Sequence, residues 1–352
     1  MTKVVINERI CEGCGDCGDV SGCLSVRPVE TEFGRKTRID QTTCNADYTC
    51  LQGDCPAFTT VTVTEGPRSS TVPEIEPLDS TALPSPTLPR LSDRSWNVRV
   101  TGVGGTGILT LAAVIATAAQ MEGFHVRGSD MTGLAQKGGS VVSDIRLSSH
   151  AVDEPGVVPA DGADLMLGVD GLTTAEPGNL GVINPRRTTA VLSSTNTPTV
   201  SMVTDVRAEH SDGVALAAAL GRNAHRMISM DAAEVSRLLF GATTFQTMIM
   251  LGVAQQSGAL PVNPDAVEAA ISANGRSVEA NLQAFRRGRQ WVADPKAITE
   301  LLQLGLSGQA DYSGDSNGKD GCHLAQSAGV PAPSTSEPTP TARTVSYTHL
   351  RA

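Results

Sequence analysis

The fold of this chain is decided near its N-terminus by the segment Cys11-Glu12-Gly13-Cys14-Gly15-Asp16-Cys17. Seven of the eight cysteines lie between this segment and Cys55, which is followed by Pro56. In the bacterial two-cluster arrangement, three closely spaced thiolates hold one iron–sulfur cluster and the fourth ligand crosses over from the other cysteine group. The spacing therefore predicts a [4Fe–4S] cluster held by Cys11, Cys14, Cys17 and Cys55.

The second cysteine group departs from this pattern because a carboxylate replaces its middle thiolate. It runs Cys44-Asn45-Ala46-Asp47-Tyr48-Thr49-Cys50. With Cys23 crossing back from the first group, a second site would be formed by Cys23, Cys44, Asp47 and Cys50. An oxygen ligand is harder than sulfur and binds such an iron more weakly. We therefore predict one or two [4Fe–4S] clusters, the second of which has Asp47 as a labile ligand or is a three-iron [3Fe–4S] cluster.

Two other kinds of structure use clustered cysteines. Zinc is held by four thiolates at similar short spacings, but seven cysteines in two crossing groups that end in Cys-Pro favour iron and sulfide. A disulfide framework needs an oxidising compartment. We recognise no signal peptide before Cys11, and seven is an odd number. Cys322 stands alone in a polar tail and is expected to be a bystander.

Charge and hydropathy argue against two classes of partner. The net charge of −10 argues against nucleic acid. The longest apolar helix-like run, residues 108–121, is shorter than the ~20 residues that span a bilayer. Because 40% of the residues are apolar and can form a core, we expect a cytoplasmic protein with neither nucleic-acid nor membrane partners.

Composition divides the chain into five parts. Residues 1–63 form a small ferredoxin-like iron–sulfur module, and residues 64–95 form a proline-rich linker, expected to be a semi-rigid tether that buries little. Residues 96–306 are expected to form a globular α/β domain. Residues 307–344 have the composition of a disordered linker, and residues 345–352 are expected to be non-native because they resemble a translated adapter sequence.

The α/β domain is predicted from alternating strand and helix patterns. Strands are expected from residue 96 into a glycine turn, and at 123–127, 141–147, 164–169 and 189–193. Helices are expected at 108–120, 213–221, 231–239, 243–258, 264–273 and 275–290. Such alternation predicts a doubly wound, mostly parallel sheet. The histidines are scattered, and we find no catalytic Ser/His/Asp or Cys/His grouping.

The turn after the first of these strands is a candidate cofactor site. Gly102, Gly104 and Gly107, with Gly105 between them, fit the pattern G-x-G-x-x-G, which lets a helix N-terminus approach an anion. A dinucleotide site would have an acidic residue at the end of the next strand, where Arg127 stands instead. Two interpretations of this glycine turn remain: it binds a phosphate of another ligand, or it only allows the helix to pack on the strand.

A second loop with glycines is the other candidate. Gly138 and Gly139 would let the backbone pass close to a ligand, and Lys137 beside them offers a charge suited to phosphate or carboxylate. The competing interpretation is an ordinary solvated loop.

Together these segments resemble the fused indolepyruvate ferredoxin oxidoreductases. The cysteine module carries the resemblance through residues 11–17, 23–26 and 30–36 and through Cys50-x4-Cys55-Pro56. The two glycine loops and the helix that ends near Arg289 resemble the γ-type 2-oxoacid oxidoreductase domain of that family. The resemblance covers about residues 4 to 292.

The resemblance implies an oxidative decarboxylation. Members of this family convert an aryl 2-oxoacid and coenzyme A into an acyl-CoA and carbon dioxide, and pass two electrons to an external ferredoxin. Thiamine diphosphate and Mg2+ are implied to lie on thiamine-binding domains of the same or a partner chain, not on these residues. The chain is therefore expected to be a fragment that is inactive alone, belongs to a homo-oligomer, relays electrons and helps to form the active site.

Two alternatives belong to other functional classes. In the first, the chain is an accessory iron–sulfur electron-transfer subunit without its own substrate site. In the second, it is a nucleotide-dependent oxidoreductase whose clusters pass electrons to a bound NAD. The missing acidic residue after the second strand weighs against NAD.

Overall fold

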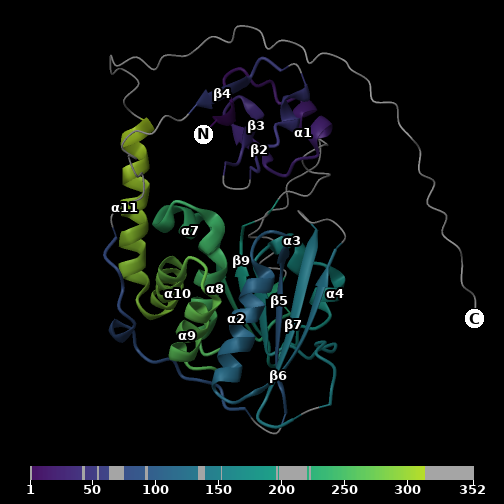
Figure 1. Ribbon diagram of the computed structural model, residues 1–352, viewed down its shortest axis with the longest axis vertical. Coiled ribbons are helices and arrows are strands. Elements are labelled where there is room, and N and C mark those ends of the chain that lie inside the picture. The colour runs from purple at the N-terminus through teal and green to yellow at the C-terminus, as the bar shows by residue number, and fades with distance from the viewer. Residues whose placement is uncertain are drawn as a thin grey trace, which may run out of the picture. The chain divides into compact units, whose positions relative to one another are not determined.

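The computed structural model describes residues 2–41, 44–53, 55–62, 75–91, 94–133, 139–151, 153–195, 197, 220–221 and 223–313. In Figure 1 the cysteine module is drawn in purple, and the α/β domain runs from blue to yellow. Within the described residues, every helix is too short or too polar to cross a membrane.

The cysteine module contains two small antiparallel sheets. One pairs β1 (Thr2–Ile6) with β4 (Phe58–Thr62), and the other pairs β2 (Val26–Thr31) with β3 (Gly34–Ile39). The last cysteine of each loop lies in a short helical segment: Cys17 in the helix α1 (Asp16–Ser21) and Cys50 in the 3-10 turn η1 (Thr49–Gln52). The module's small core consists of apolar side chains packed around the cysteines: Val4, Ile6, Val26, Ile39 and Ala57.

The α/β domain is built on a six-stranded sheet with the strand order β10-β9-β8-β5-β7-β6. Its strands are β5 (Trp96–Val103), β6 (His125–Thr132), β7 (Ser140–Ser148), β8 (Leu165–Gly168), β9 (Thr189–Ser193) and β10 (Arg226–Met230). Strands β5, β8, β9 and β10 are parallel, whereas β7 runs antiparallel to both of its neighbours. The predicted mostly parallel α/β fold is confirmed, with β7 inserted between the first two strands of the domain.

Both faces of the central strands β5, β7, β8 and β9 are buried, whereas the edge strand β6 is mostly exposed. Successive residues of a strand point to opposite faces, so a strand that is buried throughout contributes to two cores. Leu165 and Leu167 of β8 belong to the main core, together with α2 (Ile108–Met121) and α8 (Gln246–Gln256). Met166, between them, belongs to a second core with Ala190 and Leu192 of β9. The continuous apolar runs of these strands follow from this double burial.

Helices α8 and α10 (Val278–Ala293) cross at two glycines. A Cβ on Gly252 of α8 would lie 2.1 Å from the carbonyl oxygen of Phe285. A Cβ on Gly288 of α10 would lie 1.9 Å from the carbonyl oxygen of Ile249. The two helix backbones are therefore in direct contact, and Phe285 of α10 is fully buried.

Part of the proline-rich linker packs on this helical layer, contrary to the expectation of a tether that buries little. The N–H of Leu78 donates to Gln283 Oε1 at 2.8 Å, and Arg286 donates to the Leu78 carbonyl at 3.1 Å. Further along, Arg289 donates to the carbonyl of Pro84 at 3.2 Å. Prolines have no N–H group to donate, but the carbonyls of a proline-rich segment still accept hydrogen bonds, and arginines of α10 donate to those of Leu78 and Pro84.

Several elements differ from expectation. The segment before Gln246 is a 3-10 turn, η3 (Thr243–Phe245), and two short helices, α3 (Gly171–Thr174) and α4 (Pro177–Leu180), were not expected. Strand β10 was also missed. The remaining helices are α7 (Ala232–Phe240), α9 (Pro264–Asn274) and α11 (Pro295–Ser313), and the last runs past residue 306, where the domain was expected to end. The helix expected at 213–221 lies mostly outside the described residues.

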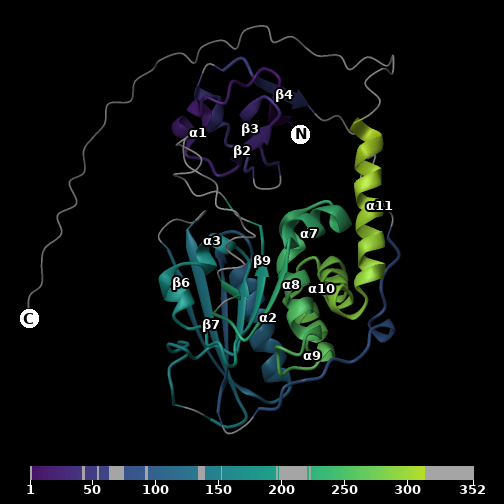
Figure 2. The same cartoon turned by 180° about the vertical axis from the view of Figure 1, so that it is seen from behind.

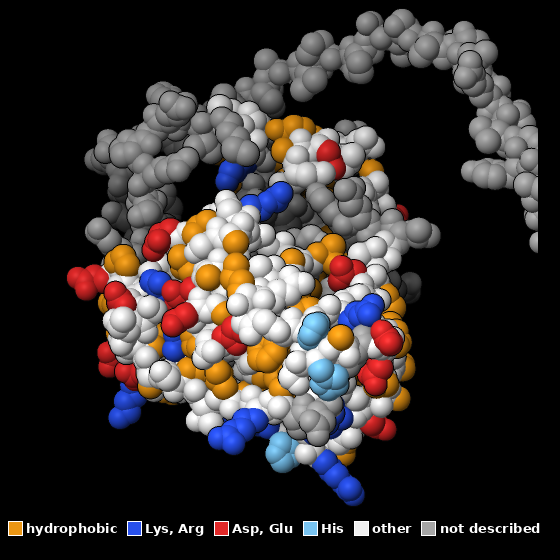
Figure 3. Space-filling model, turned by 60° about the horizontal axis from the view of Figure 1, so that its bottom comes forward, with side chains coloured by type: hydrophobic (Ala, Val, Ile, Leu, Met, Phe, Trp, Pro, Cys, Tyr) orange, Lys and Arg blue, Asp and Glu red, His pale blue; other side chains and the backbone are white. Residues whose placement is uncertain are grey.

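Helix α11 packs against α7 and α10 and completes the helical layer. Its residue Ile298 is buried, and Leu301 and Leu302 pack against the main core. Figure 2 shows α11 beside α7 and α10, seen from behind. On the face shown in Figure 3, acidic and basic side chains are interspersed among scattered apolar ones, so neither sign of charge dominates that face.

Candidate iron–sulfur sites and a glycine-lined cavity

The structure brings the first predicted ligand group together. Cys11 and Cys17 are buried, Cys55 is half-buried and Cys14 is exposed. The Cys17 thiol interacts electrostatically with Cys11, Cys14 and Cys55. Burial first, and then the neighbouring Cys11 thiol, raise the pKa of Cys17 to about 11. Such a thiol gives up its proton to solvent readily only when a bound cation stabilises the thiolate that remains.

The second predicted group is assembled in the same way. Cys50 is buried, and its thiol interacts electrostatically with Cys23, Cys44 and Asp47. Burial is the largest cause that raises the pKa of Cys50, and Cys23 is the next. Both four-member sets named from the sequence are therefore local groups in the fold.

The two cysteine groups also share one local backbone structure. The N–H of Cys11 donates to the carbonyl of Asn7, just after β1, and the N–H of Cys44 donates to that of Asp40, just after β3. The equivalent positions keep a constant separation along the chain: Ile6 and Ile39, Asn7 and Asp40, Cys11 and Cys44, Gly13 and Ala46, Cys14 and Asp47, Gly15 and Tyr48, Cys17 and Cys50.

Backbone angles and sulfur contacts confirm this equivalence. The N–H of Gly13 donates to Cys11 Sγ and the N–H of Ala46 donates to Cys44 Sγ, both at 3.4 Å. Gly13 and Ala46 have φ angles of 72° and 56°. The next pair of equivalent residues also has positive φ angles, 82° and 60°: Gly15 and Tyr48. Positive φ is costly for a residue with a side chain, so the second loop keeps this turn without the help of glycine.

The equivalence extends to the strands that follow the crossing cysteines. Cys55 precedes β4, which pairs with β1, and Cys23 precedes β2, which pairs with β3. The Ile6–Phe58 pair of one sheet corresponds to the Ile39–Val26 pair of the other. The module is therefore an internal two-fold repeat, in which each half supplies three of the predicted ligand positions to one group and one to the other.

Asp47 occupies the position equivalent to Cys14, and both residues are exposed. The Asp47 carboxylate is oriented by Thr49, whose N–H donates to Oδ1 at 3.1 Å and whose hydroxyl donates to the same oxygen at 2.9 Å. Sequence reasoning identified Asp47 but missed Thr49. The Asp-x-Thr spacing, which is common in turns, would have indicated it.

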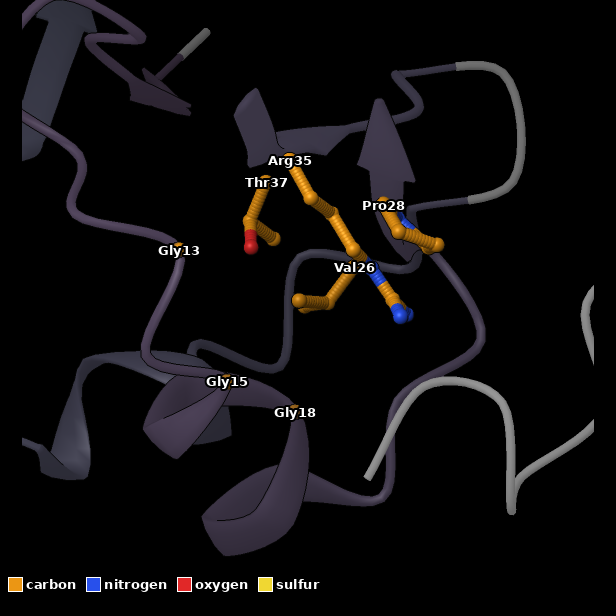
Figure 4. A pocket seen from close by; sticks show the side chains of 7 residues that line it. All are labelled: Gly13, Gly15, Gly18, Val26, Pro28, Arg35 and Thr37. Atoms are coloured by element: carbon orange, nitrogen blue, oxygen red, sulfur yellow. The ribbon is translucent and has the colours of Figure 1, made fainter. Parts of the chain in front are cut away.

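The hairpin of β2 and β3 packs against the first cysteine loop. Figure 4 shows side chains of the hairpin, among them Arg35 and Thr37, pointing toward the loop that contains Gly13 and Gly15. The cavity between them measures about 10 Å³, no larger than one water molecule. A Cβ on Gly13 would lie 2.1 Å from the carbonyl oxygen of Arg35, so a glycine is required there for close packing as well as for its φ angle.

These groups fit iron–sulfur clusters in their donor chemistry. All seven cysteines of the described module are free thiols. Among the described residues, no three His, Cys, Asp or Glu side chains converge on a point that suits one metal ion. A [4Fe–4S] cluster makes a different demand, because its ligands bind separate irons at separate corners. Buried thiols within an apolar core, with N–H groups directed at sulfur, meet that demand.

The first glycine loop lines the larger cavity. Its volume is about 560 Å³, and it is bounded by the turn after β5, the first turn of α2 and the facing ends of β6 and β7. Gly104, Gly105 and Gly107 line it, and Gly105 has open space where a Cβ would stand. Gly102 does not line it, because a Cβ there would lie 2.5 Å from the Ile108 side chain. Gly102 therefore serves helix packing.

The second glycine loop meets the first through the backbone. The N–H of Gly104 donates to the carbonyl of Gly139 at 2.8 Å, so that N–H group is already used. Lys137 and Gly138 lie outside the described residues. The described lining carries no charged side chain. It includes residues that sequence reasoning missed: Leu109, Thr110 and Thr132.

Comparisons with known proteins agree on the α/β domain. Residues 97–291 match the family model described as pyruvate ferredoxin/flavodoxin oxidoreductase. The chain is 29% identical over 194 residues to indolepyruvate oxidoreductase subunit IorB of Archaeoglobus fulgidus, covering 54% of this chain and 92% of the relative. It is 27% identical over 213 residues to 2-oxoglutarate synthase subunit KorC of the same organism, covering 60% and 96%.

Solved structures with weaker overall similarity include two oxidoreductases. Pyruvate oxidoreductase subunit PORC of Thermotoga maritima aligns with a TM-score of 0.40 and 18% identity, covering 56% of this chain and 96% of that one. A 2-oxoglutarate:ferredoxin oxidoreductase of Magnetococcus marinus aligns with a TM-score of 0.42 and 18% identity, covering 59% and 32%.

Proposed function

Because the chain belongs to the pyruvate ferredoxin/flavodoxin oxidoreductase family, we propose that it is part of an indolepyruvate, or more broadly aryl 2-oxoacid, ferredoxin oxidoreductase. The proposed reaction is oxidative decarboxylation of the 2-oxoacid with coenzyme A, which yields an acyl-CoA, carbon dioxide and reduced ferredoxin. The substrate class follows the relatives named as indolepyruvate oxidoreductase subunits.

One observation carries this proposal: a module with two groups of four predicted ligands precedes the family domain in the same chain. Clusters bound there would supply one-electron transfer. The chain's own residues would hold them, with Cys11, Cys14, Cys17 and Cys55 at the first site. The N–H groups of Gly13 and Ala46 would stabilise charge on the ligand sulfurs.

The α/β domain is proposed to help form the active site and to bind part of coenzyme A in the glycine-lined cavity. Gly105 and Gly107 border this cavity beside the N-terminus of α2, where a phosphate is favoured by helix N–H groups and the helix dipole. Gly104 is less suited, since its N–H is bonded to Gly139. Lys137 is proposed to supply the positive charge that the described lining lacks.

Thiamine diphosphate and Mg2+ are proposed to lie on partner domains, in an oligomer that works in the cytoplasm with an external ferredoxin. Thiamine diphosphate would stabilise the carbanion left by decarboxylation. This chain would then exclude water from the closed site and carry the electrons away. By itself it is expected to be inactive.

The test starts with iron and sulfide per chain after anaerobic reconstitution, where about four irons indicate one cluster and about seven or eight indicate two. The loaded chain is then combined with a thiamine-binding partner, and ferredoxin reduction is measured with indolepyruvate, pyruvate and 2-oxoglutarate. We expect coenzyme A-dependent reduction that is fastest with indolepyruvate. A chain that binds zinc and no sulfide would contradict the electron-relay role.

A second candidate is an accessory electron-transfer subunit without a substrate site, favoured by the relatives that are named as subunits. Binding of coenzyme A to the chain separates the two. Loss of that binding in Thr110→Trp, which adds bulk to a side chain that lines the cavity, favours the enzyme subunit. Reduction of ferredoxin without any coenzyme A contact to this chain favours the accessory role.

A further inference from the structure

The internal repeat makes strand β3 equivalent to strand β1, and the two strands differ in charge at one position beside the cysteine loops. Ile39 corresponds to Ile6, so Arg35 corresponds to Thr2. Side chains two residues apart lie on the same face of a strand, so Arg35 shares its face with Thr37 and with the buried Ile39. An arginine of one half therefore stands where the other half has a threonine.

Both strands lie against the loop of their own half in the same way. A Cβ on Gly13 of the first loop would lie 2.1 Å from the carbonyl oxygen of Arg35. In the second loop, the Tyr48 hydroxyl donates to the equivalent carbonyl, that of Thr2, at 3.3 Å. The Arg35 side chain points toward the first loop and lines the small cavity beside Gly15 (Figure 4). The contacts of the backbone thus fix Arg35 at the first cysteine group.

We propose that Arg35 raises the reduction potential of the cluster at the first cysteine group and so favours residence of the transferred electron there, beside the exposed Cys14. The proposal rests on the proposed function, since it requires a cluster in this module. The electron is supplied by the proposed decarboxylation and leaves to the external ferredoxin.

The physical reason is the charge that reduction adds. A cluster that takes up one electron gains one negative charge, and a cation held nearby stabilises this reduced form more than the oxidised form. Arg35 keeps its positive charge at all pH values at which the protein folds, because a guanidinium does not lose its proton in that range. Its effect on the potential is therefore a fixed property of the fold.

Carboxylates of the first loop act in the opposite direction. They are exposed, and uncharged residues stand at the equivalent positions of the second loop: Glu12, Asp16 and Asp19 against Asn45, Thr49 and Gln52. Charges in water are screened over about 10 Å by salt, whereas buried or half-buried charges are screened less. Arg35 is half-buried between the hairpin and the loop. We therefore expect the arginine to have the larger effect on the potential.

The experiment is a redox titration of the full chain, reconstituted anaerobically with iron and sulfide and followed by EPR. In Arg35→Gln the ratio of reduced to oxidised first cluster at a fixed potential should fall about tenfold, which corresponds to a midpoint lowered by about 59 mV for one electron. Arg35→Lys keeps the charge and should change the ratio by less than about twofold. A role of Arg35 in packing alone would not separate these two variants.

Two matched variants use the repeat and the strand. Thr2→Arg places a cation at the equivalent position of the second half, so it should raise the midpoint of a second cluster and leave that of the first unchanged. Lys36→Gln removes a cation from the neighbouring residue of β3, which points to the opposite face, and should change the ratio by less than about twofold.

Iron and sulfide are measured for every variant, so that equally loaded chains are compared. A midpoint that is unchanged in Arg35→Gln, or that shifts equally in Lys36→Gln, refutes the role of Arg35 and leaves the electron relay intact. If Arg35→Gln does not take up its cluster, Thr2→Arg decides, and a second midpoint that does not rise refutes the inference. If the wild-type chain takes up no sulfide, the proposed function fails, and the inference fails with it.

Discussion

A buried ion pair at the centre of the sheet offers a quantitative test of the fold. Arg99 of β5 lies opposite Asp144 of β7, and their side chains form two hydrogen bonds of 2.7 Å. The side chains are 5% and 0% exposed. Each also has a backbone partner, because Arg99 donates to the Gly178 carbonyl and Asp144 accepts from the N–H of Val158. The pair therefore ties the antiparallel strand β7 to the parallel part of the sheet.

Breaking the pair from either side should be strongly destabilising. Arg99→Met or Asp144→Leu leaves one buried charge without its partner, which typically costs about 3–5 kcal/mol. That is a large part of the total stability of a domain, which is about 5–15 kcal/mol. The double variant removes both charges and leaves only the backbone groups of Gly178 and Val158 unpaired, at about 1–3 kcal/mol each.

Denaturant unfolding followed by tryptophan fluorescence measures these costs. Both tryptophans belong to the α/β domain, Trp96 in β5 and Trp291 in α10, so the signal reports on this domain. We expect the double variant to lose less free energy of unfolding than the sum of the single variants, with a coupling of up to about 3 kcal/mol. Single variants that cost less than about 1 kcal/mol, or strictly additive costs, would refute the reasoning.

Three further predictions concern other parts of the molecule. Gly288→Ala should lower the free energy of unfolding by about 1–3 kcal/mol, because its Cβ would meet the Ile249 carbonyl at 1.9 Å; Gly178→Ala, with open space around it, is the control in the same denaturant assay. Arg289→Met should release the segment around Pro84, and limited proteolysis should then cut within residues 75–91 faster than in the wild type. Without metal, the cysteine module should lose stability as pH rises, because the pKa of Cys17 is raised from 9.0 to about 11 in the fold. The folded state then holds this proton more tightly than the unfolded state, so the contribution is complete below pH 9.0 and is lost toward pH 11. Circular dichroism against pH checks this, and Cys17→Ser should flatten the profile.

The grouping of the cysteines in the fold was predictable, because short spacings along the chain limit which thiols can meet. Cys11, Cys14 and Cys17 must lie on one loop, and the Cys-Pro ending of Cys55 pointed to the crossing ligand. The same reasoning found Asp47 but left its role open. The backbone angles show that Asp47 is equivalent to Cys14, since the positive φ angles of its neighbours Ala46 and Tyr48 match those of the glycines in the first loop. Propensity alone does not predict such angles for residues with side chains.

Other features depend on partners distant in sequence. The proline-rich segment was taken for a tether because its own composition buries little, whereas arginines of α10 supply the hydrogen bonds that hold it. Gly104 fitted a phosphate-binding pattern, but its N–H is bonded to Gly139, which a pattern within one loop cannot reveal.

The sequence by itself determined which cysteines lie together in the module and the alternating elements of a mostly parallel α/β domain. Both depend on residue type and local spacing, which the chain carries wherever it lies. Only the tertiary structure decided that the module is a two-fold repeat, that β7 enters the sheet antiparallel, and which glycines border the cavity. These features arise from pairing between segments far apart in the chain, which local spacing does not fix.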